Sequence, residues 1–169
     1  LAEFALSRKD PAYVGRAKEV QKAEKAREAG QCMGEALPEL RDIMHKIKET
    51  YDVHKENVGV GSTIFAVKPG DGSAREQAAS CQKVLGGWAN IANEYATKRY
   101  RSNLINWANG DYIFIPEITK AVKEKASTIQ AFVVNKDMKP FELKMDELTD
   151  DERQIILDGC LINFYRNSR

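Results

Sequence analysis

The chain has 169 residues, of which 43% are hydrophobic and 30% are charged, a composition typical of one soluble globular domain with a sizeable core. Its 26 basic and 25 acidic residues give a net charge of +1, which argues against nucleic acid or an anionic membrane as a partner. No run of about eighteen apolar residues occurs, and the first residues lack a basic and an apolar region, so we expect neither a transmembrane helix nor a signal peptide.

Two helices are predicted in the first fifty residues. A highly charged helix over residues 13–29 ends at Gly30, a residue type that often follows a helix. A second helix begins near Pro38, and its apolar residues recur at intervals of three and four. These apolar residues are Leu40, Ile43, Met44, Ile47 and Tyr51. We expect the two helices to form an N-terminal helical hairpin whose charged faces are solvated.

Beyond residue 57, β-branched segments alternate with helix signals. The predicted strands occupy residues 58–67, 88–92, 112–115, 128–134 and 141–145. The predicted helices occupy residues 73–85, 97–107, 117–125 and 149–158, the last beginning with a capping box at Thr149 and Glu152 and ending at Gly159. A buried segment is expected after that glycine, at residues 160–162. This alternation predicts an α/β fold with a mixed sheet flanked by helices.

The three cysteines and two histidines have no spacing typical of a metal site. Cys32, Cys81 and Cys160 are widely separated and odd in number, which indicates a reducing cytoplasm rather than a disulfide framework. Because no two of them form a Cys-x-x-Cys pair, we expect this chain alone to hold no zinc or iron–sulfur cluster. His45 and His54 have no helical ligand spacing, and we expect both at the surface.

The most informative feature is a glycine-rich turn over residues 69–72 followed by a helix start. Ser73 and Glu76 have the spacing of a capping box, in which each side chain accepts a hydrogen bond from the other residue's backbone N–H. The glycines would then only supply positive φ angles for the turn. Spacing alone favours this structural interpretation, because capping boxes are common helix starts.

A functional interpretation uses the same geometry. A helix N-terminus binds carboxylate or phosphate through its unpaired N–H groups and its partial positive charge. Arg75 adds a guanidinium group that can hold a carboxylate with two hydrogen bonds. Ser73, placed in this positive field, could act as a base beside a bound polycarboxylate.

Two segments resemble the swivel domain of the aconitase and isopropylmalate dehydratase superfamily. Residues 72–78 (GSAREQA) are similar to that family's Gly-Ser-Ser-Arg-Glu-His/Gln-Ala signature. Residues 101–106 (RSNLIN) are similar to its Arg-Gln-Asn-Leu-Ile-Asn segment, at a similar distance along the chain. The resemblance covers about residues 57–116, and two motifs in the same order are more specific than either motif alone.

The resemblance implies a role for each matched residue. Ser73 matches the serine that acts as the base on the proton α to a substrate carboxylate. Arg75 matches the arginine that binds a substrate carboxylate, and Gly72 and Ala74 belong to the same substrate-binding loop. Ala74 replaces a second serine of the family, which leaves the exact substrate open. The implied fold is a single swivelling β/β/α domain over residues 1–169.

The resemblance also implies a reaction and a partner. The whole enzyme would be a hydro-lyase that reversibly dehydrates a hydroxy di- or tricarboxylic acid. A [4Fe–4S] cluster, held by cysteines on other domains, would act as a Lewis acid on the departing hydroxyl. This chain would be a C-terminal fragment that binds no cofactor or metal itself, is inactive alone, and has the cluster-bearing domains as its partner.

Two alternatives stay open on the sequence. The first is a free-standing small subunit of an isopropylmalate dehydratase-type enzyme. The second belongs to another class: a non-catalytic anion-binding module in which Ser73 only caps a helix.

Overall fold

The computed structural model describes residues 2–8, 10–66, 81–92, 110–145, 147–159 and 161–167. The chain divides into two compact units, Leu1–Tyr100 and Arg101–Arg169. The described residues are mixed α/β, with a small parallel sheet in the first unit and an antiparallel sheet in the second, which confirms the predicted α/β class. Within the described ranges the two kinds of pairing lie in separate sheets rather than in one mixed sheet.

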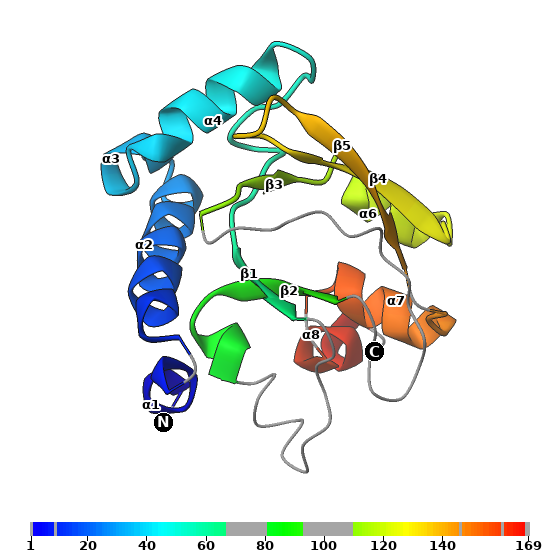
Figure 1. The fold of residues 1–169 in the computed structure, drawn as a ribbon. Coiled ribbons are helices and arrows are strands. Elements are labelled where there is room, and N and C mark those ends of the chain that lie inside the picture. The colour runs from blue at the N-terminus through cyan, green and yellow to red at the C-terminus, as the bar shows by residue number, and fades with distance from the viewer. Residues whose placement is uncertain are drawn as a thin grey trace. The chain divides into compact units, whose positions relative to one another are not determined.

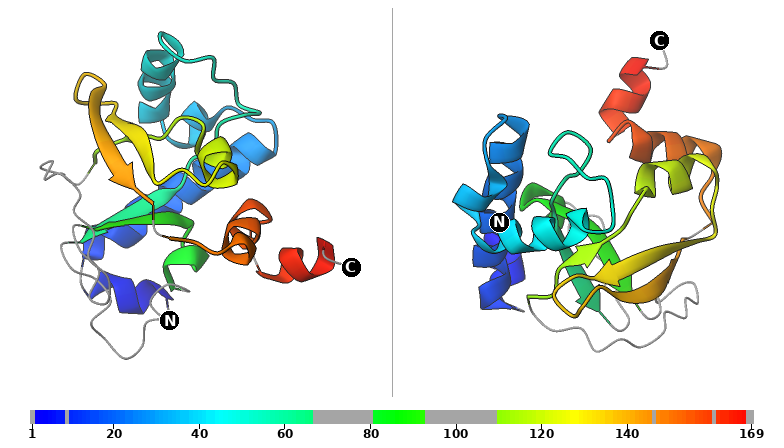
Figure 2. Two further views of the ribbon diagram at one scale, coloured as in Figure 1. Left: turned by 90° about the vertical axis from the view of Figure 1, so that its right-hand side faces the viewer. Right: turned by 90° about the horizontal axis from the view of Figure 1, so that it is seen from above.

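The first unit begins with four helices. They are α1 (Ala2–Ser7), α2 (Pro11–Glu28), α3 (Met33–Ala36) and α4 (Glu39–Lys48). The two longer ones confirm the predicted helices, whereas α1 and α3 were not predicted. Since α3 contacts both α2 and α4, and α4 runs at a steep angle to α2 (Figure 1 and Figure 2), the two predicted helices do not form a simple hairpin.

Local sequence explains both ends of α2. The Asp10 carboxylate accepts a hydrogen bond from the Ala12 backbone N–H at 3.0 Å, and Pro11 occupies the first helical turn, where no N–H is needed. After the last turn, Gly30 adopts a φ of +75°, the left-handed conformation that commonly terminates a helix. The predicted end of this helix is therefore confirmed.

Helix α2 is buried mainly through small side chains, which allow close approach of its neighbours. Ala17 is 1% exposed and Ala23 is fully buried, and Ala17 packs with Val14 and Leu85 in one apolar cluster. Helix α4 instead buries larger residues, Leu40 and Ile47, from its predicted apolar face. Both helices thus stabilise the unit by burying apolar surface, α2 mainly with small side chains and α4 with larger ones.

A parallel pair of strands, β1 (Ser62–Ala66) and β2 (Gly87–Ala92), completes the first unit. Residues 81–84 are helical, and Gly86, with a φ of +80°, ends that turn before β2, as predicted. Strand β1 starts later than predicted. Gly59 and Gly61, which precede it, lie against the ring of Trp88, where an added Cβ would overlap the indole. Residues 67–80, between β1 and the helical turn, lie outside the described residues.

The second unit contains an antiparallel sheet with the strand order β3-β4-β5. Its elements are β3 (Ile113–Phe114), α6 (Ile118–Lys123), β4 (Thr128–Val133) and β5 (Lys139–Lys144). All three strands were predicted to within a few residues. Helix α6 is shorter than predicted because Glu117 and Lys125, at its two ends, both have positive φ angles. The helix predicted over residues 97–107 lies outside the described residues.

Two further helices, α7 (Asp150–Leu157) and α8 (Leu161–Asn167), end the chain. The predicted capping box is confirmed: the Thr149 hydroxyl accepts from the Glu152 N–H at 3.3 Å, and the Glu152 carboxylate accepts from the Thr149 N–H at 2.8 Å. The buried segment expected after Gly159 is wrong. The chain forms α8 instead, with Leu161 and Ile162 49% and 79% exposed.

Removal of the Thr149 cap should destabilise the second unit modestly. We expect Thr149→Ala to lower the free energy of unfolding by about 1 kcal/mol, because the Glu152 N–H loses its partner. Urea denaturation followed by circular dichroism measures this. Thr119→Ala, an exposed threonine within α6, is the matched control and should change stability by less than about 0.5 kcal/mol. Equal losses in the two variants would contradict a specific capping role.

Candidate functional site

The loop predicted to carry the chemistry lies outside the described residues. This applies to all four predicted site residues, Gly72, Ser73, Ala74 and Arg75, and to the second matched segment at residues 101–106. The structure does describe what lies on both sides of the loop, namely β1 before it and residues 81–92 after it.

The described strands on the two sides of the loop form a parallel pair. Strand β1 ends at Ala66, and Gly72 follows six residues later. Because β1 and β2 are parallel, residues 67–86 must connect the carboxyl end of one strand to the amino end of the next. Ligands in open α/β sheets bind outside the carboxyl ends of the strands. In the sequence, the predicted loop follows the carboxyl end of β1.

Helix α2 holds the chain on both sides of this loop. The Tyr13 hydroxyl lies 3.1 Å from the Ser62 hydroxyl at the start of β1. Two turns along the helix, the Gln21 amide donates to the Val84 carbonyl oxygen at 3.1 Å. The same helix thus contacts the start of the strand that precedes the loop and the helical turn that follows it.

The start of β2 is fixed by polar side chains as well. Gln82, only 6% exposed, donates through Nε2 to the Ala89 carbonyl oxygen at 2.9 Å. The Thr63 hydroxyl of β1 donates to that same oxygen, also at 2.9 Å. An added Cβ at Gly87 would overlap the Gln82 side chain, so the close approach of Gln82 to β2 depends on this glycine.

A buried ion pair on α2 anchors the segment that leads into β1. Arg27 donates to the two carboxylate oxygens of Glu24 at 2.8 and 2.7 Å, and Glu24 also accepts from the Val60 N–H at 3.0 Å. Arg27 donates in addition to the Lys55 carbonyl oxygen at 2.8 Å. The Glu24 hydrogen bonds raise the pKa of Arg27 above its ordinary value. The expectation that the charged faces of this helix are solvated is wrong at Glu24, which is 8% exposed.

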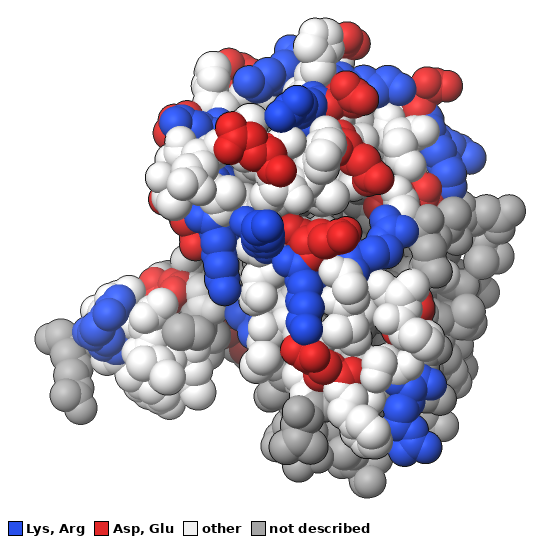
Figure 3. All heavy atoms as spheres, turned by 90° about the vertical axis from the view of Figure 1, so that its left-hand side faces the viewer, with Lys and Arg blue, Asp and Glu red and all other residues white. Residues whose placement is uncertain are grey.

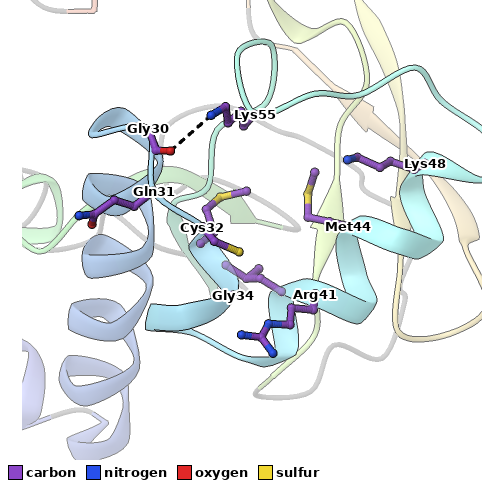
Figure 4. Close-up of a pocket in the computed structure, with 10 residues that line it drawn as sticks. Gly30, Gln31, Cys32, Gly34, Arg41, Met44, Lys48 and Lys55 are labelled. Carbon is purple, nitrogen blue, oxygen red and sulfur yellow. Dashed lines mark hydrogen bonds between the residues drawn. The ribbon is translucent and has the colours of Figure 1, made fainter.

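A pocket of about 300 Å³ is lined by the loop that follows α2, by α3 and α4, and by Lys55 (Figure 4). Three basic side chains line it: Arg41 and Lys48 from α4, and Lys55 from the following loop. Cys32, an exposed free cysteine, also lines the pocket. The Lys55 ammonium group donates to the Gly30 carbonyl oxygen at 3.3 Å. The sequence did not predict this site, because Lys55 and Gly30 are 25 residues apart and only the folded chain brings them together.

Both histidines lie at the surface, as predicted. The His45 side chain is 81% exposed, and its Nδ1 lies 3.4 Å from Oε1 of Glu49. The His54 side chain is 62% exposed, and its Nε2 lies 2.9 Å from Oδ1 of Asp52.

Over the part of the chain that the structure describes, no three His, Cys, Asp or Glu side chains gather as metal ligands would. Among the same residues, no helix is long and apolar enough to cross a bilayer.

Charge is mixed on the face shown in Figure 3. Basic and acidic side chains are interspersed there, with uncharged residues between them, and neither sign covers a continuous area. This face of the molecule therefore offers no broad basic surface of the kind that binds a nucleic acid backbone.

Comparisons with known proteins gave no match. No family model, no curated protein and no solved structure is significantly similar to this chain. The resemblance to aconitase-type swivel domains therefore stands on the two sequence segments.

Proposed function

We propose that this chain is the swivel domain of an aconitase-type hydro-lyase located in the cytoplasm, acting on a hydroxy di- or tricarboxylic acid. The observation that carries the proposal is the pair of matched motifs, residues 72–78 and 101–106, in the order of that family. The position of the first motif, shortly after the carboxyl end of a parallel strand, supports it.

In this proposal, residues of the chain bind the substrate and move one proton. Arg75 and the N–H groups at the start of the helix hold a substrate carboxylate, and Gly72 and Ala74 leave room for it. Ser73 takes the proton α to that carboxylate as the hydroxyl on the adjacent carbon departs, which leaves a carbon–carbon double bond. The positive field of the helix start stabilises the negative charge that Ser73 needs to act as a base.

The iron–sulfur cluster belongs to other domains in this proposal, because the sequence contains no Cys-x-x-Cys pair. When bound there, the cluster would supply a Lewis acid for the leaving hydroxyl. The partners of this chain are accordingly the cluster-bearing domains, either in the same polypeptide or, as in a dehydratase small subunit, in a separate one.

A non-catalytic role for Ser73 has one specific observation in its favour. The same four-residue spacing at Thr149 and Glu152 forms a capping box with both reciprocal hydrogen bonds. The chain therefore uses this spacing structurally at one helix start, and Ser73 and Glu76 would do the same in an anion-binding module that catalyses nothing.

Replacement of the proposed carboxylate-binding arginine tests substrate binding. We expect Arg75→Lys, in the enzyme that contains this chain, to raise KM by about tenfold or more and to change kcat less. A lysine ammonium cannot reproduce the two parallel hydrogen bonds that a guanidinium makes to a carboxylate. Steady-state kinetics with citrate and with isopropylmalate measure both constants.

The matched control for this variant is Arg16→Lys, an exposed position on α2. It should leave both constants unchanged. If Arg75→Lys behaved like this control for every hydroxy acid that the enzyme converts, Arg75 would not be a substrate ligand and the proposed site would be wrong.

A further inference from the structure

The pocket formed by α3, α4 and the loop after α2 has three exposed basic side chains at its rim. Arg41, Lys48 and Lys55 line it, and no acidic side chain of the described residues does. Within the described ranges Arg41 and Lys48 form no ion pair or side-chain hydrogen bond. Lys55 donates one hydrogen bond, to the Gly30 carbonyl oxygen, which leaves two N–H donors of its ammonium group for a ligand.

The floor of the pocket is apolar. Met33 and Leu40 line it and are 8% and 3% exposed, and Met44 is half-buried beside them. The volume, about 300 Å³, is at the lower end of the range for small-molecule sites. An apolar floor below a cationic rim suits a small ligand that has an apolar body and one anionic group.

Arg41 is positioned by a glycine. An added Cβ at Gly34 would overlap Cγ and Nε of Arg41, so the arginine side chain lies directly over the backbone of α3. Gly34 has no positive φ, which means that the position needs glycine for space and not for backbone conformation. The stem of Arg41 therefore packs on the α3 backbone, although the residue as a whole is exposed.

We propose that this pocket is a binding site for a small apolar carboxylate, such as an aryl carboxylate. In Figure 4 the amino group of Lys48 points from α4 toward the side where Cys32 and Lys55 lie, whereas the Lys55 ammonium is directed at Gly30 and the Arg41 guanidinium points away from both lysines. The three cations thus reach the rim of the pocket from α4 and from the loop after it. Sulfur atoms of Cys32, Met33 and Met44 would suit a soft metal ion. Three neighbouring cations disfavour a metal cation and favour an anion.

Alkylation of Cys32 reports occupancy of the pocket, because this thiol is exposed and lines it. The rate of reaction with iodoacetamide is measured by peptide mass spectrometry, with benzoate as the ligand probe and Cys81 of the same molecule as the internal reference. Benzoate at saturation should slow alkylation of Cys32 by about fivefold or more and leave Cys81 unchanged. Benzamide, which has the same shape without the charge, should not protect, and chloride at equal ionic strength should not protect either.

Two variants test the named residues. The triple substitution Arg41→Gln/Lys48→Gln/Lys55→Gln should abolish protection by benzoate. Gly34→Ala, which keeps every charge but displaces Arg41, should weaken protection by several-fold, seen as a higher benzoate concentration at half-protection.

A matched control removes the same net charge elsewhere. Lys123→Gln/Lys139→Gln/Lys144→Gln changes three exposed lysines of the second unit and should leave protection intact. Equal protection by benzamide, no protection by benzoate, or unchanged protection in the triple variant of the pocket would overturn the proposal. None of these outcomes depends on Ser73 or on the proposed hydro-lyase function.

Discussion

In the enzyme that contains this chain, Ser73→Ala is expected to lower kcat by about two to four orders of magnitude and to change KM little. A general base acts on the transition state, so its removal affects the chemical step more than substrate binding. Steady-state kinetics with the preferred hydroxy acid measure both constants. Protein stability should fall by only about 1 kcal/mol, since the substitution also removes a helix cap.

The control for Ser73→Ala is Thr149→Ala, which removes a cap of the same type at α7. Both variants lose a side-chain acceptor at a helix N-terminus, and only Ser73 is proposed to touch substrate. If the two variants had equal and near-normal turnover, Ser73 would be a structural cap and the chain would be better described as an anion-binding module.

The second large effect concerns stability. Glu24→Gln is expected to lower the free energy of unfolding of the first unit by about 2–3 kcal/mol, because Arg27 would keep its charge without a carboxylate partner. The side chains of Glu24 and Arg27 are 11% and 18% exposed, so solvent screens the pair only partly. The expected loss lies below that of a fully buried pair for this reason. Urea denaturation of the variant measures it.

Glu28→Gln is the matched control, since Glu28 is an exposed glutamate on the same helix. It should change stability by less than about 0.5 kcal/mol. Because ionised Glu24 raises the pKa of Arg27, the contribution of this arginine is complete near neutral pH, far below its unfolded pKa. This contribution is lost only as the pH rises through the folded pKa of Arg27. The difference in free energy of unfolding between the Glu24→Gln and Glu28→Gln variants should therefore be the same at pH 6 and pH 8. Equal stability of the two variants would contradict the anchoring role of Glu24.

Short-range signals in the sequence predicted the ends of elements well. Gly30, Gly86 and Gly159 all adopt positive φ angles at the ends of helical segments, a conformation that costs other residues energy. The capping box at Thr149 likewise involves residues only three positions apart. Such features depend on neighbours in the chain and can be recognised without knowledge of the fold.

Features that depend on distant residues could not be predicted in this way. The buried Glu24 accepts a hydrogen bond from the Val60 N–H, 36 residues away. Gly59 and Gly61 leave room for the ring of Trp88, which packs over them from β2. The basic pocket likewise exists only because the loop after α4 returns Lys55 to the end of α2. A charged helix residue, a glycine or a lysine carries no local sign of such a partner.

The site itself was predicted by resemblance rather than by geometry. Ser73 and Arg75 lie outside the described residues, so their assignment depends on the matched motifs. The described structure contributes the parallel strands on either side of the loop and the hydrogen bonds that link Tyr13 to Ser62 and Gln21 to Val84.

The activity of Ser73→Asp tests the central claim most directly. Aspartate is as good a helix cap as serine, so the variant keeps its stability, which a thermal unfolding curve confirms. It also places a negative charge where the substrate carboxylate binds, and it removes the serine base. The expected result is a folded enzyme with turnover reduced at least a hundredfold. Near-normal turnover in this variant would contradict the assignment of Ser73 as the base.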